Sequence, residues 1–348
     1  MNRISQIRPI SRKAMAEAKK QWDSVAKPLN SLGLLEQAVI RIAGIIGSAD
    51  VRIDKRTAVI MCADNGVTAE GVTQTGSEVT QIVAKGIADG TANISRMAQT
   101  FRTEAAAVDI GMRGEVSHPG IWNRKVGFGT ADIACGPAMT EEQAERAVAV
   151  GIDIMRELKE QGVQIVVTGE MGIGNTTTSS AIASVLLGTS VKDVTGRGAG
   201  LDDRGLARKT EVIKRAIEVN HPRADRPIEL LAALGGYEIA GMTGLFLGGA
   251  VYGIPVVIDG FISAAAAALA AGIAPEAKEY MLCSHVSKEP AGAAMLAYLG
   301  MKPVICGELC LGEGTGGILL LPLLDGALSV YHSAHRFSEL PMEAYHAL

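Results

Sequence analysis

The chain has few aromatic residues, no cluster of basic residues and no long apolar run. Aromatic side chains make up 4% of its 348 residues, which argues against the stacking platforms of proteins that bind single-stranded nucleic acid. The net charge is -4, and no stripe of lysine and arginine suggests a nucleic-acid partner. The most apolar segment, Ser263 to Gly272, is far shorter than the roughly 20 residues of a membrane span. We therefore expect neither a nucleic acid nor a membrane as partner.

Cysteine is also scarce. The five cysteines have irregular spacing, which is typical of a chain kept reduced in the cytoplasm. Cys306 and Cys310 lie four residues apart, but no further cysteine or histidine stands nearby to complete a zinc site. We predict that these two are buried small side chains and that the protein needs no metal. The N-terminus lacks the apolar run of a signal peptide, so we expect a cytoplasmic location.

Glycine, in contrast, is abundant at 41 residues, and apolar residues make up 48% of the chain. Short β-type runs alternate with helical patterns, which predicts an α/β fold with a mostly parallel sheet and helices on both faces. The clearest strand candidates are residues 57–62, 105–110, 163–167, 255–258 and 303–306. The first 50 or so residues read as helical, with a helix capped by Ser31 that runs to Ile46. A second helix is predicted from the Thr140 cap to about Glu160.

A glycine-rich segment follows the predicted strand 163–167. Parallel sheets bind ligands outside the carboxyl ends of their strands, so this loop is a candidate site. Gly172 and Gly174 permit close approach of the backbone, and residues 175–177 (Asn-Thr-Thr) offer donors where a helix begins. We interpret the segment as an anion cradle, although a plain glycine-rich turn with a threonine cap is the alternative. Glu170 among these glycines favours the functional reading. The segment matches neither GxxxxGK[ST] nor GxGxxG.

Two further loops carry candidate residues. Gly198 lies in a glycine-rich loop ahead of a helix with Lys209, which is either a phosphate-binding charge or a solvated surface residue. Glu313 stands between Gly312 and Gly314 ahead of an apolar helix. Its carboxylate is either a helix-capping group or a general base on uncrowded backbone. A loop at residues 284–290 is expected to be polar and exposed. From the residues alone, we expect transfer chemistry on a phosphorylated small molecule.

Several of these segments resemble the nicotinate-nucleotide:dimethylbenzimidazole phosphoribosyltransferase family, which activates the lower ligand of cobamides. The long matches are GEMGIGNTT at residues 169–177 and LGEGTG at residues 311–316. Shorter matches occur, in the family's order, at residues 27–33, 63–67, 196–198, 234–241, 258–261 and 284–285. The resemblance covers the chain from near residue 27 to near residue 326.

The resemblance implies a Rossmann-like catalytic domain over residues 51–325. It also implies a small helical domain built from both chain ends, residues 1–50 and 326–348. Members of the family work without metal or other cofactor and are usually homodimers. A heteromer with a paralogue is the alternative assembly, and a non-catalytic paralogue subunit or nucleotide-binding partner is the alternative function. Retention of both Glu170 and Glu313 argues against the alternative function.

The resemblance also implies a reaction and a set of residue roles. Phosphoribosyl passes from nicotinate mononucleotide to a base, with Glu313 as the proton acceptor and Glu170 holding the ribose or assisting proton transfer. The remaining implied residues fall into three groups: phosphate and ribose contacts at Gly172, Gly174, Asn175, Thr176, Thr177, Gly198 and Lys209; a base pocket at Ser77, Gln81 and Leu311; and substrate positioning by Asp259 and Ser287. Residues 73–81 depart from the usual family pattern, so 5,6-dimethylbenzimidazole, adenine and phenolic bases all stay open.

Overall fold

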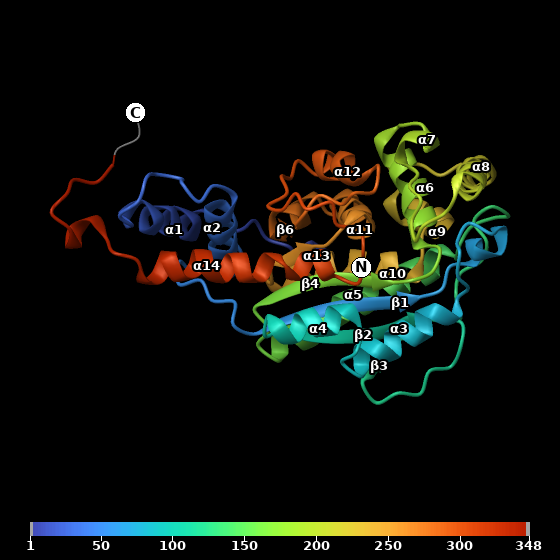
Figure 1. Ribbon diagram of the computed structural model, residues 1–348, viewed down its shortest axis with the longest axis horizontal. Coiled ribbons are helices and arrows are strands. Elements are labelled where there is room, and N and C mark those ends of the chain that lie inside the picture. Colours follow the sequence, from blue (N-terminus) through green and yellow to red (C-terminus); the bar gives the residue numbers. More distant parts are fainter. Residues whose placement is uncertain (1–2, 346–348) are drawn as a thin grey trace.

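The structure is a computed structural model that describes residues 3–345 (Figure 1). Its centre is one six-stranded sheet in the order β3-β2-β1-β4-β5-β6, and every neighbouring pair is parallel. This order winds outward in both directions from β1 and β4, as in Rossmann-like folds. The strands are β1 (Arg56–Ala63), β2 (Glu104–Gly111), β3 (Ile121–Asn123), β4 (Ile165–Met171), β5 (Val256–Ile258) and β6 (Met281–Cys283). The predicted fold class is confirmed.

Helices cover both faces of the sheet (Figure 1). The first half of the chain forms α1 (Arg12–Ser24), α2 (Leu34–Ile46), α3 (Glu78–Ala88), α4 (Asn93–Thr100), α5 (Glu141–Glu160), α6 (Asn175–Leu187) and α7 (Val191–Val194). The second half forms α8 (Asp203–Asn220), α9 (Pro227–Leu234), α10 (Tyr237–Tyr252), α11 (Phe261–Ile273), α12 (Gly292–Tyr298), α13 (Thr315–Ile318) and α14 (Leu320–Ser333). Short 3-10 turns lie at Ile4–Gln6, Gly66–Glu70, Pro275–Tyr280 and Phe337–Glu339.

The predicted strand at residues 303–306 does not form. The backbone N–H groups of Val304 and Ile305 both donate to the single carbonyl of Ser284, at 3.0 Å each. Two donors that converge on one acceptor cannot continue a ladder, so only an isolated bridge between Ile305 and His285 remains. The sheet ends instead on β6, and β6 and β3 are two short strands that the sequence pattern did not reveal.

The helix starts show one confirmed cap and one wrong one. Thr140 and Gln143 form a reciprocal capping box at the start of α5, with bonds of 3.1 and 2.9 Å. Helix α2 begins after Gly33 rather than at a Ser31 cap. There, the carboxylate of Glu36 accepts a hydrogen bond from the backbone N–H of Leu32 at 2.8 Å. The capping role that was expected for Ser31 thus falls to an acidic side chain inside the helix.

Helix α10 is buried on every side and packs directly on α5. Gly244 on α10 and Gly151 on α5 make this approach possible, because a Cβ on either residue would strike the backbone of the opposite helix. The two helices together cover one face of the central strands. This packing fixes the sheet, and with it the carboxyl ends of β1 and β4.

Helices from the two terminal parts of the chain, α1, α2 and α14, lie together at one end of the molecule (Figure 1). The rings of Trp22 and Tyr331 pack 5.0 Å apart, and Val25 bridges to Arg336 in antiparallel fashion. Residues 1–2 and 346–348 of the predicted small domain lie outside the described residues. Between residues 3 and 345, no helix combines the length and apolar character that crossing a membrane demands.

Candidate active site

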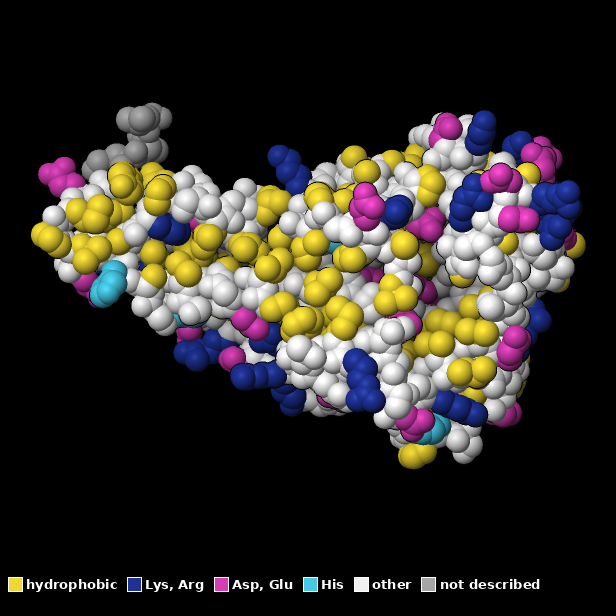
Figure 2. Space-filling model, viewed as in Figure 1, with side chains coloured by type: hydrophobic (Ala, Val, Ile, Leu, Met, Phe, Trp, Pro, Cys, Tyr) yellow, Lys and Arg dark blue, Asp and Glu magenta, His cyan; other side chains and the backbone are white. Residues whose placement is uncertain are grey.

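A cavity of about 400 Å³ opens at the carboxyl edge of the sheet. Its walls come from the segments after β4, β5 and β6, from residues 309–316 and from α3. Figure 2 shows a depression near the middle of this face, with acidic side chains set back inside it. A smaller cavity of about 240 Å³ lies beside Arg41 and Cys283, and no carboxylate occurs among the described residues that line it. Because Rossmann-like sheets bind ligands where the strand order reverses, the larger cavity is the candidate active site.

Glu313 lines this cavity on a strained turn. Its φ is 60°, between Gly312 at 89° and Gly314 at 86°, so three consecutive residues adopt the left-handed conformation that favours glycine. The carboxylate does not cap its own helix, because the N-cap of α13 is Gly314 and has no side-chain bond. It accepts instead from the backbone N–H of Ile94 at 3.2 Å and from the Asn93 amide at 3.3 Å, at the start of α4. The loop thus points the carboxylate away from α13.

Asp259 fastens the Glu313 loop to the sheet. It follows β5, and its two carboxylate oxygens accept from the backbone N–H groups of Gly317 at 2.7 Å and Gly314 at 3.2 Å. Burial raises the pKa of Asp259, and nearby His285 opposes that rise. A side chain on one strand end therefore holds both sides of a loop more than fifty residues later in the chain.

Glu170 ends β4 and faces the same cavity. Burial, together with the neighbouring carboxylates of Asp259 and Glu238, holds the pKa of Glu170 well above its usual value. The Asn175 amide donates a hydrogen bond to its carboxylate. A Cβ on Gly312 would lie 2.7 Å from Glu170 Oε1, so glycine at 312 lets the Glu313 loop come close to Glu170. Glu170 is thus suited to act in its protonated form, as a donor.

The segment predicted to be an anion cradle connects β4 to α6. Gly174 has a φ of 97° and sits at the N-cap of α6 without a side-chain cap. Gly172 and Thr176 line the cavity, whereas Thr177 is fully buried behind them and its hydroxyl oxygen has no partner among the described residues. A Cβ on Gly172 would lie 2.6 Å from the carbonyl oxygen of Ala63. The cradle is therefore built from backbone that no larger side chain could replace.

Lys209 reaches the cradle from α8. Its side chain is 1% exposed, and its ammonium group donates to Thr176 Oγ1 at 2.8 Å. Burial lowers the pKa of Lys209 to about 8. Gly198 lies against both groups, since a Cβ there would come within 2.8 Å of Thr176 Oγ1 and 3.3 Å of Lys209 Nζ. A buried ammonium beside a helix start is a strong attractor for an anion, so Lys209 is not a solvated surface lysine.

The cavity wall formed by α3 differs from the predicted base pocket. Leu311 lines the cavity, but Ser77 and Gln81 do not. Val79 and Val83 do, one helical turn apart on the same face of α3. Gln81 lies on the opposite face, where it packs against Gly114. The helical period of α3 decides which of its side chains face the cavity, and it turns Val79 and Val83 inward and Gln81 away.

Comparisons with known proteins agree with this geometry. A family model described as phosphoribosyltransferase matches residues 7–340. The chain belongs to this family. It is 43% identical over 345 residues to nicotinate-nucleotide--dimethylbenzimidazole phosphoribosyltransferase of Ruminiclostridium cellulolyticum, covering 99% of this chain and 98% of the relative. It is 42% identical to the Halalkalibacterium halodurans protein of that name, covering 97% and 94% of the two chains.

A solved structure shares the fold. The crystal structure of the phosphoribosyltransferase of the same name from Thermus thermophilus superposes with a TM-score of 0.88 at 36% identity, covering 95% of this chain and 98% of that one. The protein is therefore an enzyme of the phosphoribosyltransferase class. The resemblance inferred from the motifs is confirmed.

Other predictions about this phosphoribosyltransferase need correction. The 284–290 loop is not generally exposed, because His285 and Ser287 are buried and line the cavity. Ser284 Oγ lies 3.0 Å from His285 Nδ1. Cys306 and Cys310 are exposed rather than buried, and the segment 303–306, which holds Cys306, forms no buried strand. Ser287, which the resemblance assigned to substrate positioning, does lie in the cavity wall.

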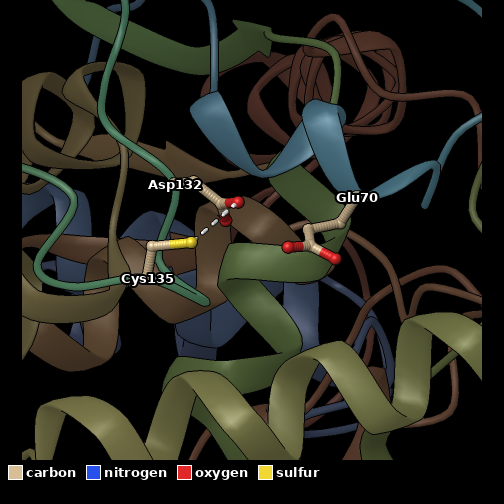
Figure 3. Close-up of side chains that lie close together, drawn as sticks. All are labelled: Glu70, Asp132 and Cys135. Atoms are coloured by element: carbon tan, nitrogen blue, oxygen red, sulfur yellow. Dashed lines mark hydrogen bonds between the residues drawn. The ribbon is translucent and has the colours of Figure 1, made fainter.

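One cluster of potential metal ligands lies away from the cavity in the described part of the chain. Glu70, Asp132 and Cys135 bring their ligand atoms within 4.8 Å of one another (Figure 3). Arg215 already pairs with Glu70 at 2.5 Å, and the thiol of Cys135 donates to Asp132 at 3.7 Å. The ligand atoms of the cluster are therefore already engaged by partners within the protein, and the cluster does not present a prepared metal site.

Proposed function

We propose that the protein transfers phosphoribosyl from nicotinate mononucleotide to a lower-ligand base during assembly of the cobamide nucleotide loop. The base is 5,6-dimethylbenzimidazole or a related azole or phenol, and the products are an α-riboside 5′-phosphate and nicotinate. One observation carries the proposal: the buried Lys209 bonds to Thr176 of the glycine-built anion cradle, and Thr176 lines the same cavity as Glu313. Phosphate anchoring and a base are the two things that this reaction needs.

The roles of the residues follow from their positions. The phosphate rests on Gly172, Gly174 and the start of α6, with Lys209 as its cation. The carboxylate of Glu313 accepts the proton of the azole N–H, and the freed lone pair forms a bond to the ribose C1′. The bond from C1′ to the nicotinate nitrogen breaks, and its electron pair neutralises the pyridinium. Because the base attacks the face opposite the leaving group, the anomeric carbon inverts.

The remaining polar groups position the substrate. Glu170, whose pKa burial and neighbouring carboxylates raise, donates a hydrogen bond to the ribose from its protonated form. Asp259 positions Glu313 by holding its loop, and Ser287 contacts the sugar phosphate. For the base we place Val79, Val83 and Leu311 around the ring, since these apolar side chains line the cavity beside Glu313. None of these steps requires a metal or another cofactor.

We also propose the domain division and the assembly. Residues 1–50 and 326–348 form a small helical domain beside the catalytic domain of residues 51–325, supported by the packing of Trp22 on Tyr331. The enzyme works as a homodimer, and exposed apolar side chains such as Tyr298 and Leu323 are candidates for the contact. Its five free thiols suit a reducing cytoplasm.

The reaction is tested by mass. Purified protein is incubated with nicotinate mononucleotide and, separately, with 5,6-dimethylbenzimidazole, adenine and a phenol, and the products are identified by mass spectrometry. Release of nicotinate together with a riboside phosphate of the added base is expected for at least the benzimidazole. If nicotinate stays bound to ribose with every base, the proposed function is wrong. The same panel ranks the bases.

A further inference from the structure

Glu289 stands at the anion cradle, where the proposed reaction gives it no part. It follows β6 and lines the cavity together with Thr176 and Gly198. The backbone N–H of Gly198 favours its ionised form and lowers the pKa of its carboxyl group. Its Oε2 is buried without a partner among residues 3–345. A Cβ on Gly196 would lie 2.9 Å from the Glu289 carboxyl carbon, so the acid rests directly on the cradle loop.

The position of Glu289 conflicts with that of a phosphate. Gly198 and Lys209 are the donors that a phosphate would use at this end of the cavity, and both favour the ionised form of Glu289. A phosphomonoester carries a charge of about −1.5 to −2 at neutral pH. Two anions that share one partly buried site cannot both stay fully ionised without large repulsion, so one of them holds a proton.

We propose that Glu289 is a positioning residue that takes up one proton from solvent when the nucleotide phosphate enters the cradle. In the free protein, its ionised carboxylate occupies the donors and balances Lys209. In the complex, the neutral carboxyl group donates its O–H to a phosphate oxygen, while Gly198 and Lys209 turn to the phosphate. No covalent bond to carbon or phosphorus changes. The proposal rests on the anion cradle of the proposed function.

The surrounding charges leave Glu289 and Lys209 as the responsive pair. Burial raises the pKa of Glu289, and Lys209 opposes that rise. Other charged groups near this end of the cavity have partners of their own. Arg197 pairs with Asp203 at 2.5 Å, Lys288 pairs with Glu308 at 3.2 Å, and His285 lies beside Asp259 and Ser284. Glu170 and Glu313 face the same cavity from β4 and from the 309–316 loop. Since the pKa of Lys209 is about 8, this lysine stays charged below pH 7.

Sulfate is the appropriate probe, because it is divalent and does not itself take up a proton near neutral pH. Calorimetric titrations between about pH 5.5 and 7, in two buffers with different ionisation enthalpies, count the protons taken up on binding. For the native enzyme we expect net uptake and a Kd that rises with pH, by up to about tenfold per unit. Glu289→Gln should show no uptake and a Kd independent of pH in this range. Glu308→Gln removes an exposed carboxylate nearby and should behave like the native enzyme.

The outcomes separate this inference from the proposed function. If the native enzyme does not bind sulfate, the cradle itself is wrong and both ideas fail. If it binds sulfate without proton uptake, or if Glu289→Gln keeps the native uptake, the role of Glu289 is refuted while the cradle stands. Steady-state kinetics with nicotinate mononucleotide give a second readout: Glu289→Gln should flatten the pH dependence of KM, with a much smaller effect on kcat. Absence of proton uptake by the native enzyme refutes the role even if the variant folds poorly, and the pH dependence of KM tests it again in the variant.

Discussion

Replacing Glu313 with glutamine should separate proton abstraction from folding. The native carboxylate accepts from Ile94 N–H at 3.2 Å and from the Asn93 amide at 3.3 Å. Glutamine keeps one acceptor oxygen and the same length, so it loses at most one charge-assisted hydrogen bond, worth about 1.5–3 kcal/mol of stability. The loop itself is held by Asp259 rather than by Glu313. The variant should therefore fold, with a modest fall in melting temperature.

The turnover of Glu313→Gln should fall far more than its stability. General-base catalysis contributes about 10²–10⁴ in rate, so kcat should fall by about 100-fold or more, which corresponds to at least about 2.7 kcal/mol of the barrier. Binding of nicotinate mononucleotide, measured by calorimetry, should stay close to native because the phosphate is held elsewhere in the cavity.

The assay is nicotinate release with 5,6-dimethylbenzimidazole as acceptor, with Glu308→Gln as the matched control. Glu308 lies five residues earlier, is exposed and pairs with Lys288 at 3.2 Å, so its replacement should leave turnover unchanged. Native turnover in Glu313→Gln would refute the assignment of the base. A raised KM with unchanged kcat would reassign Glu313 to substrate binding.

Three further changes probe the groups around Glu313. Lys209→Met should weaken binding of nicotinate mononucleotide by about 10- to 100-fold, because a charged hydrogen bond to the phosphate is lost. In the native enzyme, the affinity measured by calorimetry should fall as pH rises through about 8, where Lys209 loses its proton. Gly312→Ala places a Cβ 2.7 Å from Glu170 Oε1 at a φ of 89°, and chemical denaturation should show a loss of about 1–3 kcal/mol together with reduced kcat. Burial raises the pKa of Glu238 from 4.5 to about 7, so the folded state binds more protons than the unfolded state in that window, and stability should decline as pH rises from about 4.5 to 7. Glu238→Gln should reduce that slope in urea titrations, and an unchanged slope would contradict the reasoning.

Short-range signals in the sequence predicted much of this molecule. Thr140 and Gln143 are three residues apart, so their capping box could be read directly. The glycines around Glu313 and in the 172–174 segment indicated backbone placed close to a ligand, and Gly172 and Gly312 line the cavity. The alternation of strands and helices predicted the parallel sheet.

Long-range contacts escaped the sequence reading. No local pattern links Asp259 to Gly317, whose N–H it accepts. Likewise, no local pattern shows that the N–H groups of Val304 and Ile305 donate to the Ser284 carbonyl. Strands β3 and β6 have three residues each, too few to show a period. Glu289 looked like one more polar residue in a loop, because its burial comes from the 196–198 backbone on another part of the chain.

The packing of α1 and α2 against α14 has a consequence for how the protein is synthesised. Helices α1 and α2 leave the ribosome first, yet Trp22 is covered by Tyr331, near the end of the chain. During synthesis, the apolar surface around Trp22 stays exposed until almost the entire catalytic domain has been translated. Such late closure favours chaperone contact and misassociation between nascent chains. A ribosome that stalls before α14 would therefore release a chain that contains all six strands of the sheet. In that chain, the apolar surface of α1 and α2 that α14 normally buries would stay exposed.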